Sequence, residues 1–327
     1  FIERHMADIS ITRQSTDFGM PVPGGEEGQV LYVWFEAPFV YVTNVGYGTD
    51  DAMLDRYWPA SLMLIGKDIL KFHCGLLPAM FMAAGLPLPE TVFAHGFLTI
   101  EGDKMSKTVG NIVDPLELAD EFGSDALRLF LLRENRFGED GEFSLARMRH
   151  RYEGDLANEL GNLAQRVLAM AGKFCDALAP KAGEGDLAAV WTECEKGMEA
   201  YDFIAVFDAI WAVLRDSNKL IVQEKPWELI KTDQAKTKEV IGTLLERLRQ
   251  VAWLLKPLLP MTADELLSRL GVAETERTKT WEQAKIWGGI PVGAAITVGA
   301  PLFPRFVEKR AESPDPENVR KKAQEPA

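Results

Sequence analysis

Two lysines lie three residues apart in the polar segment "EGDKMSKTVGN", residues 101–111. Lys104 and Lys107 could each bring an ammonium group to the β- and γ-oxygens of a triphosphate, and could follow the charge that develops on a pyrophosphate leaving group. The segment is neither a Walker A loop nor a G-x-G-x-x-G turn. The spacing therefore suggests phosphate chemistry, and a solvated surface turn is the alternative that these residues leave open.

Apolar runs of strand length precede this loop. The segments "VLYVWFEA" (30–37), "SLMLIG" (61–66) and "TVFAHGFLTI" (91–100) are rich in β-forming residues. Residues 67–85, between the last two runs, are apolar all round, as in a helix buried against a sheet. Strand, helix and strand in this order predict a βαβ unit with parallel strands. The loops at the carboxyl ends of such strands are where α/β folds place ligands.

Helix signals follow the lysine loop. Asp114 can cap a helix that has Pro115 at its first position and ends at Gly123, and Ser124 can cap the next helix. From about residue 145 onward the apolar periodicity is that of helices, which predicts a bundle of four or five. Three stripes carry this pattern: Leu156, Leu160, Leu163, Val167 and Met170; Phe203, Phe207, Ile210, Leu214 and Ile221; and Val240, Leu244, Leu248, Val251 and Leu255.

The expected organisation is therefore an α/β domain followed by an all-α domain. We place the first over residues 1–145 and the second over 146–306, and we expect the polar tail, 307–327, to be disordered. Two domains are also what a chain of 327 residues would ordinarily form.

Composition narrows the possible functions. The net charge of −13 argues against a general nucleic-acid binder with a broad basic surface, although a local basic strip could still read one RNA. We expect no membrane segment, because no run of about 18 apolar residues occurs, and no secretory signal at the start. The three cysteines form no C-x-x-C pair, so we expect reduced thiols, a cytoplasmic location and no structural zinc.

The segment "KMSKT", residues 104–108, resembles the KMSKS signature of class I aminoacyl-tRNA synthetases. Its surroundings are more specific, because "IGKDILKFHC", "FAHGFLTIEGDKMSKTVGN", "DPLELADEFGSDALRLFLLRE", "DLANELGNLAQRV" and "EKPWEL" follow one another in this order. Together these motifs resemble the methionyl-tRNA synthetases, from about residue 8 to about residue 306. The resemblance implies part of a Rossmann-like class I catalytic domain followed by a helical-bundle anticodon-binding domain.

The implied activity is that of a methionine–tRNA ligase, which uses ATP to form methionyl-adenylate and then transfers methionine to tRNA(Met). Mg²⁺ would accompany ATP, and no residue of this chain is assigned as a metal ligand. The resemblance implies that Lys107 stabilises the transition state of adenylate formation and that Lys104 assists with the phosphates.

The resemblance also places the adenosine. Gly66 and Asp68, in "GKD", correspond to the stretch that meets the ribose. Asp68 could simply cap a helix that begins at Ile69, and both roles can hold. His95 and Gly96 correspond to a segment that borders the adenine, and a purely structural histidine at a strand end is the alternative.

The implied methionine pocket combines two segments. Its residues are Trp34, Ala37, Pro38, Tyr41, Ile69 and His73. An aromatic slot suits a thioether, although a single histidine on an apolar helix could equally be a core residue. This chain departs from the family at Leu77, where Trp is usual, and in "FVY", where a Gly usually precedes Tyr41.

In the helical domain the resemblance points to anticodon recognition by four residues. Trp227, after Pro226, would provide a stacking surface for a base, and Asn162 and Arg166 would donate to base edges. The alternative has Trp227 packed inside the bundle and Arg166 as a surface charge.

One departure is larger. The sequence contains no His-x-Gly-His, although the family carries a HIGH-type motif, a carboxylate for the methionine amino group and often a zinc knuckle early in the catalytic domain. We therefore expect this chain to be the C-terminal part of the enzyme, inactive alone and partnered by the N-terminal half. Another class I synthetase, such as one for leucine or valine, and a non-catalytic tRNA-binding fragment remain the alternatives.

Overall fold

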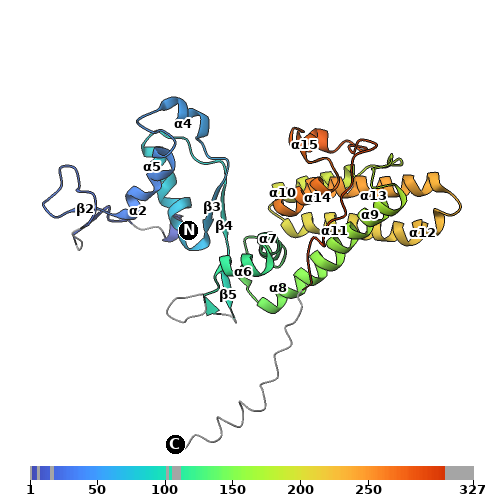
Figure 1. Ribbon diagram of the computed structural model, residues 1–327. Helices are drawn as coiled ribbons and strands as arrows, with labels where there is room; N and C mark the ends of the chain where they lie inside the picture. The colour runs from blue at the N-terminus through green and yellow to red at the C-terminus, as the bar shows by residue number, and fades with distance from the viewer. Residues whose placement is uncertain (1, 6–7, 15–17, 101–102, 105–111, 306–327) are drawn as a thin grey trace, which may run out of the picture. The chain divides into compact units, whose positions relative to one another are not determined.

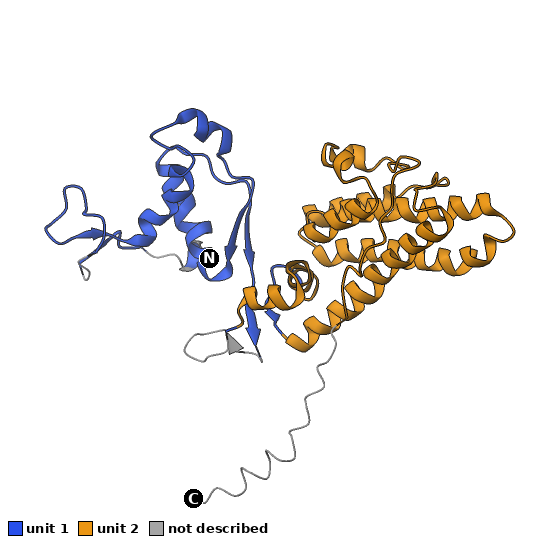
Figure 2. Cartoon of the chain, in the orientation of Figure 1, with its two compact units in different colours: residues 1–112, 135–143 blue, residues 113–134, 144–327 orange. Residues whose placement is uncertain are grey.

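The computed structural model describes residues 2–5, 8–14, 18–100, 103–104 and 112–305. The chain divides into two compact units (Figure 2): residues 1–112 with 135–143 form the first, and residues 113–134 with 144–327 form the second. Within the described ranges, no helix is both long enough and apolar enough to cross a membrane.

The first unit contains the predicted βαβ arrangement. Strand β3 (Met63–Gly66) pairs in parallel with β4 (Val92–His95), in a register that aligns Gly66 with His95. The connection consists of a 3₁₀ turn, η2 (Lys67–Ile69), a π-helical segment, η3 (Phe72–Leu76), and helix α5 (Leu77–Ala83). A core cluster formed by Val42, Trp58, Met63, Leu77, Met80 and Phe81 joins α5 to β3. The parallel pairing expected from the sequence is thus confirmed.

The N-terminal part of this unit differs from the sequence prediction. It contains α1 (Ile2–His5), β1 (Thr12–Arg13), β2 (Val30–Leu31), α2 (Val33–Glu36), the 3₁₀ turn η1 (Ala37–Phe39), α3 (Val40–Thr43) and α4 (Asp51–Tyr57). The predicted strand over residues 30–37 is therefore wrong beyond Leu31. The apolar run does not alternate, so it suits a helix as well as a strand, and Pro38 occupies the first turn of η1, a position that proline favours.

The run over residues 91–100 forms two strands. After β4, strand β5 (Leu98–Ile100) pairs antiparallel with β6 (Asp103–Lys104) and parallel with β7 (Gly141–Glu142). Lys104 is thus the last residue of β6, and Lys107 lies outside the described residues.

The second unit is helical (Figure 1), and it confirms the predicted bundle. Its helices are α6 (Pro115–Phe122), α7 (Ser124–Arg133), α8 (Leu145–Arg151), the π-helical η4 (Tyr152–Gly161), α9 (Asn162–Phe174), α10 (Ala188–Glu199), α11 (Phe203–Glu224), α12 (Pro226–Leu229), α13 (Gln234–Leu255), α14 (Pro260–Arg269), α15 (Ala273–Arg277) and α16 (Trp281–Ala284). Of the three predicted stripes, all residues except Met170 and Phe203 are buried.

The helix starts were predicted with mixed success. Asp114 caps α6, because its carboxylate accepts a hydrogen bond from the backbone N–H of Leu116. The prediction that Ser124 caps the next helix is wrong. Gly123, at φ 87°, occupies the cap position of α7, and the hydroxyl of Ser124 contacts Sδ of Met261 at 3.1 Å instead.

A buried ion cluster joins α13 to the C-terminal segment of this unit. Arg249, with 0% of its surface exposed, donates to the carboxylates of Glu246 and Glu276 and to the carbonyls of Ala284 and Ile286. Burial opposes the charge of Arg249, but the two carboxylates outweigh it and raise the pKa of the guanidinium.

Candidate functional site

The carboxyl ends of β3 and β4 bring together three of the residues predicted to hold adenosine. Gly66 and His95 are Cα partners at the last register position of the two parallel strands. A Cβ atom on residue 66 would lie 2.6 Å from Oδ1 of Asp68 and 3.9 Å from Cε1 of His95. The glycine at position 66 thus leaves room for the Asp68 carboxylate to lie beside the end of β3.

Asp68 lies within the 3₁₀ turn η2, whose N-cap is Gly66. The alternative in which Asp68 caps a helix beginning at Ile69 is therefore wrong. Both Asp68 and His95 are exposed, and Nδ1 of His95 donates to the carbonyl of Gly96 at 2.9 Å, which holds the ring at the strand end. This edge of the sheet thus presents a carboxylate and an imidazole to solvent.

The predicted methionine pocket is joined across its two segments by Tyr41 and His73. The Tyr41 hydroxyl lies 2.9 Å from Nε2 of His73, and Nδ1 of His73 lies 3.1 Å from the carbonyl of Ile69. A carbonyl can only accept, so Nδ1 donates to Ile69, and in the neutral ring Nε2 accepts from Tyr41. Because His73 is only 4% exposed while Tyr41 is 37% exposed, the pair connects the surface to the interior.

Trp34 contacts a residue that the sequence analysis missed. Its ring stacks on Phe72 at 4.4 Å between centroids, with 10° between the planes. Phe72 directly precedes His73 in η3. Its position next to a predicted site histidine is the sequence signal by which Phe72 could have been identified. Of the other predicted pocket residues, Pro38 is buried and Ala37 is partly buried. Leu77, at which this chain departs from the family, is fully buried in the core cluster.

A cavity of about 750 Å³ borders Asp68, one of the adenosine candidates. It is lined by Glu3, Arg4, Lys67, Asp68, Leu70, Lys71, Cys74 and Gly75. Its charged lining consists of three basic side chains, from Arg4, Lys67 and Lys71, and two carboxylates, from Glu3 and Asp68. Among the described residues, no group of three or more His, Cys, Asp or Glu side chains could hold a metal ion.

The predicted anticodon residues lie in the second unit. Trp227 is 44% exposed in α12, directly after the buried Pro226, so it is not packed inside the bundle. Lys225, at φ 42°, ends α11 in a left-handed conformation and turns the chain into α12. Asn162 is exposed on α9, and Nη1 of Arg166, one turn later, donates to Oδ1 of Asn218 on α11 at 3.0 Å.

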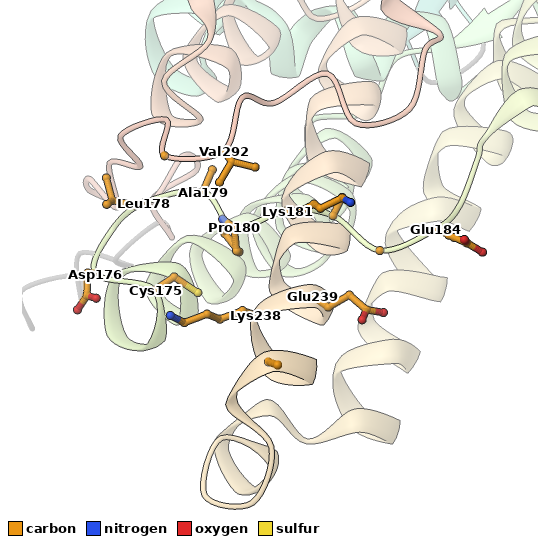
Figure 3. A pocket seen from close by; sticks show the side chains of 14 residues that line it. Cys175, Asp176, Leu178, Ala179, Pro180, Lys181, Glu184, Lys238, Glu239 and Val292 are labelled. Atoms are coloured by element: carbon orange, nitrogen blue, oxygen red, sulfur yellow. The ribbon is translucent and has the colours of Figure 1, made fainter.

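The second unit also contains a cavity of about 920 Å³ (Figure 3). It is formed by residues 175–184, the start of α13 with Lys238 and Glu239, and Val292 with Gly293. None of the predicted site residues lines it, and its rim carries charges of both signs.

Comparisons with known proteins match the chain to two families, and the boundary between the two matches lies inside the second unit. Residues 1–168 match the family described as "tRNA synthetases class I (M)", and residues 176–315 match "Anticodon binding domain of methionyl tRNA ligase". The methionine–tRNA ligase of Brucella suis biovar 1 is 41% identical over 94% of this chain and 61% of its own length. That of Caldanaerobacter subterraneus is 40% identical over 96% of this chain and 50% of its own length.

A solved structure, Mycobacterium tuberculosis methionyl-tRNA synthetase in complex with methionyl-adenylate, is 41% identical, with a TM-score of 0.82 over 92% of this chain and 61% of that one. The chain thus spans 50% to 61% of the length of these relatives. The predicted α/β region followed by a helical domain is confirmed, and the chain belongs to the methionyl-tRNA synthetase family.

Proposed function

We propose that this chain provides the lysine loop, the adenosine-binding strand ends, the methionine side-chain pocket and the anticodon-binding domain of a methionine–tRNA ligase. The observation that carries this proposal is the joining of distant segments within the first unit. The hydroxyl of Tyr41 meets Nε2 of His73, and Gly66, beside which the Asp68 carboxylate lies, pairs with His95 in the parallel register. The family resemblance assigns the first pair to methionine and the second group to the adenosine of ATP.

The proposed reaction has two steps. A carboxylate oxygen of methionine attacks the α-phosphorus of ATP, and pyrophosphate leaves. A terminal ribose hydroxyl of tRNA(Met) then attacks the methionyl carbonyl, and AMP leaves. In the first step Lys107 and Lys104 would stabilise charge on the departing phosphates, while Asp68 accepts hydrogen bonds from ribose hydroxyls. Mg²⁺ would enter with ATP as part of the substrate.

The methionine side chain would lie beside Trp34 and Tyr41. A thioether gains roughly 0.3–1.5 kcal/mol from contact with an aromatic ring edge. The hydrogen bond from Tyr41 to His73 fixes the orientation of both rings, so the slot is held in shape before the substrate enters. This preorganisation supports a side-chain pocket at this place.

We further propose that the 327 residues do not form methionyl-adenylate alone. They contain no His-x-Gly-His motif, and no residue in them is assigned to the methionine amino group. Activity would require the corresponding N-terminal catalytic residues of the family, on the same or on a second chain.

The test is ATP–pyrophosphate exchange with the purified chain alone and after addition of the N-terminal half of the Brucella relative's catalytic domain. We expect methionine-dependent exchange only in the two-part enzyme, and little exchange with leucine or valine. Exchange by the chain alone would contradict the proposed dependence, and a preference for another amino acid would contradict the assigned substrate. If the two-part enzyme binds tRNA(Met) but shows no exchange, the chain is a tRNA-binding fragment.

A further inference from the structure

Asp140 joins the residues that directly follow the two parallel strands. Its Oδ2 accepts a hydrogen bond from Nζ of Lys67 at 2.5 Å, and its Oδ1 accepts one from the backbone N–H of Phe97 at 2.8 Å. Lys67 lies between Gly66 and Asp68, and Phe97 follows His95 and Gly96. One carboxylate therefore connects both segments to which adenosine binding is assigned.

Asp140 lies in residues 135–143, which belong to the first unit and pack closely against the segment that follows β4. The N–H of Gly141 donates to the carbonyl of Phe97 at 2.9 Å, in line with the pairing of β7 with β5. The rings of Phe93 and Phe137 are stacked, 4.9 Å apart. A Cβ atom on residue 96 would overlap the backbone carbonyl of Glu139, so only glycine allows these two backbone segments to approach so closely. Asp140 is thus held in place by backbone contacts on both sides.

The pair is more suited to orientation than to stability. The side chains of Lys67 and Asp140 are 42% and 51% exposed, and an exposed ion pair contributes little to the free energy of unfolding. The hydrogen bond from Lys67 and the one from the N–H of Phe97 hold the pKa of Asp140 below its ordinary value, so the carboxylate is ionised at neutral pH. Lys67 is fixed from a second direction, since its Nζ lies 4.8 Å from the centroid of the Phe97 ring.

Lys67 also precedes Asp68, the carboxylate assigned to the ribose. The Lys67 ammonium is paired with Asp140, and without that pairing the carboxylate of the next residue, Asp68, would compete for its charge. Pairing with Asp140 therefore keeps the Lys67 ammonium away from Asp68 and leaves the Asp68 oxygens available to hydroxyl donors.

We propose that Asp140 is a positioning residue for the nucleotide: through Lys67 and the N–H of Phe97 it sets the separation of the Gly66–Asp68 and His95–Gly96 segments, and it keeps Asp68 available to the ribose. This inference rests on the proposed function, because it assigns a support to the adenosine end of that site.

Two substitutions separate the contributions of Asp140. Asp140→Asn keeps an oxygen that can accept from the N–H of Phe97 but loses the ionic attraction to Lys67, whereas Asp140→Ala loses both. In the two-part enzyme we expect the KM for ATP to rise about tenfold for Asp140→Ala and less for Asp140→Asn, with little change in the KM for methionine. Glu142→Gln, which removes an exposed carboxylate from the same segment, is the matched control and should change neither KM.

A double-mutant cycle tests the pairing itself. In a Lys67→Met background, Asp140→Asn should have little further effect on the KM for ATP, because the partner of the lost charge is already absent. Additive effects of the two substitutions would overturn the pairing. Equal increases of both KM values together with a lower Tm would show a general structural role and would also overturn the proposal.

Hydrogen exchange on the 327-residue chain gives a result that does not depend on ligase activity. The backbone N–H of Phe97 should exchange faster in Asp140→Ala than in the unmutated chain, while that of Gly141, which donates to a backbone carbonyl, should change less. Unchanged exchange at Phe97 would overturn the proposed support. Lack of ATP–pyrophosphate exchange in the unmutated two-part enzyme would instead contradict the proposed function.

Discussion

The hydroxyl of Tyr41 lies 2.9 Å from Nε2 of His73, 32 residues further along the chain. Tyr41 belongs to the short helix α3, in which the next residue, Val42, is fully buried. His73 belongs to the π-helical segment before α5. This hydrogen bond connects the two segments to which methionine binding is assigned. Its loss should therefore weaken the binding of methionine more than the binding of ATP.

Tyr41→Phe should therefore weaken methionine binding in the two-part enzyme. The substitution keeps the ring but removes the donor, which leaves the buried Nε2 of His73 without its partner, at a cost of about 1–3 kcal/mol. We expect a higher KM for methionine and poorer discrimination against side chains of similar shape, measured by ATP–pyrophosphate exchange. Tyr47→Phe, which removes the hydroxyl of a tyrosine that is equally exposed, at 37%, serves as the control. Unchanged kinetics with a lower Tm would assign Tyr41 to the core instead.

Lys107→Ala should affect the rate rather than substrate binding. If the ammonium of Lys107 stabilises charge that appears only in the transition state, its removal should lower the rate constant of adenylate formation by about two to three orders of magnitude. Single-turnover kinetics with the two-part enzyme would measure it, and methionine affinity without ATP should stay nearly constant. A loss of methionine affinity as large as the loss of rate would exclude this role.

The cysteines should differ in reactivity towards alkylating reagents. Burial, reinforced by the carboxylates of Glu195 and Glu193, raises the pKa of Cys194 to about 12, so at pH 8 its thiol is protonated as well as inaccessible. Burial also raises the pKa of Cys175, whereas Cys74 is exposed. A short pulse of iodoacetamide followed by mass spectrometry should therefore label Cys74 first. Rapid labelling of Cys194 in the folded chain would show that α10 opens readily.

Much of the fold follows from local patterns. The apolar stripes of the helical unit predicted its core, because a helix that packs on one side repeats every three to four residues. The parallel strands β3 and β4 were equally readable, since each is a short run of β-forming residues and an apolar helical segment separates them. The segment after Leu31 was misassigned because an apolar run without alternation fits two structures.

The supports of the site were not readable in the same way. Asp140 contacts Lys67 from 73 positions away in the sequence, and Arg249 binds Glu276 across 27 positions. A charged residue in a sequence has the same local pattern whether it is solvated or paired. Such partners are decided by tertiary packing, which single-sequence patterns do not contain.

The buried ion cluster around Arg249 predicts a large loss of stability when one partner is removed. Glu276 is 0% exposed and accepts hydrogen bonds from Arg249, Trp253 and Lys279. Glu276→Ala leaves a buried guanidinium without one of its carboxylates, so the free energy of unfolding should fall by roughly 3–5 kcal/mol. Urea unfolding of the full chain would measure this.

Glu274→Ala is the matched control for that measurement. Glu274 lies on the same short helix, α15, but its side chain is 81% exposed and its ion pair with Arg277 is at the surface. Its removal should change the free energy of unfolding by no more than about 0.5 kcal/mol. Similar losses for the two variants would mean that the helix, not the buried carboxylate, determines the stability.

Trp227→Ala should weaken anticodon binding without unfolding the helical unit. Pro226 cannot continue α11, and the turn at Lys225 leaves the indole of Trp227 44% exposed at the start of α12. Stacking of a base on an aromatic ring is worth roughly 1–3 kcal/mol, so binding of a CAU anticodon stem-loop should weaken about ten- to a hundredfold. Fluorescence anisotropy would measure the affinity, and far-UV circular dichroism would confirm that the helices remain.

The control for Trp227 is a stem-loop with a changed anticodon. It should bind the unmutated chain weakly and lose little more affinity on substitution, because its bases do not make the specific contacts. In the two-part enzyme the same substitution should depress the charging of tRNA(Met) and leave ATP–pyrophosphate exchange intact, since exchange does not involve the tRNA. Equal losses for both stem-loops would mean that Trp227 contributes only general contact with RNA, and the reading of the anticodon would then have to be assigned to other residues of the bundle.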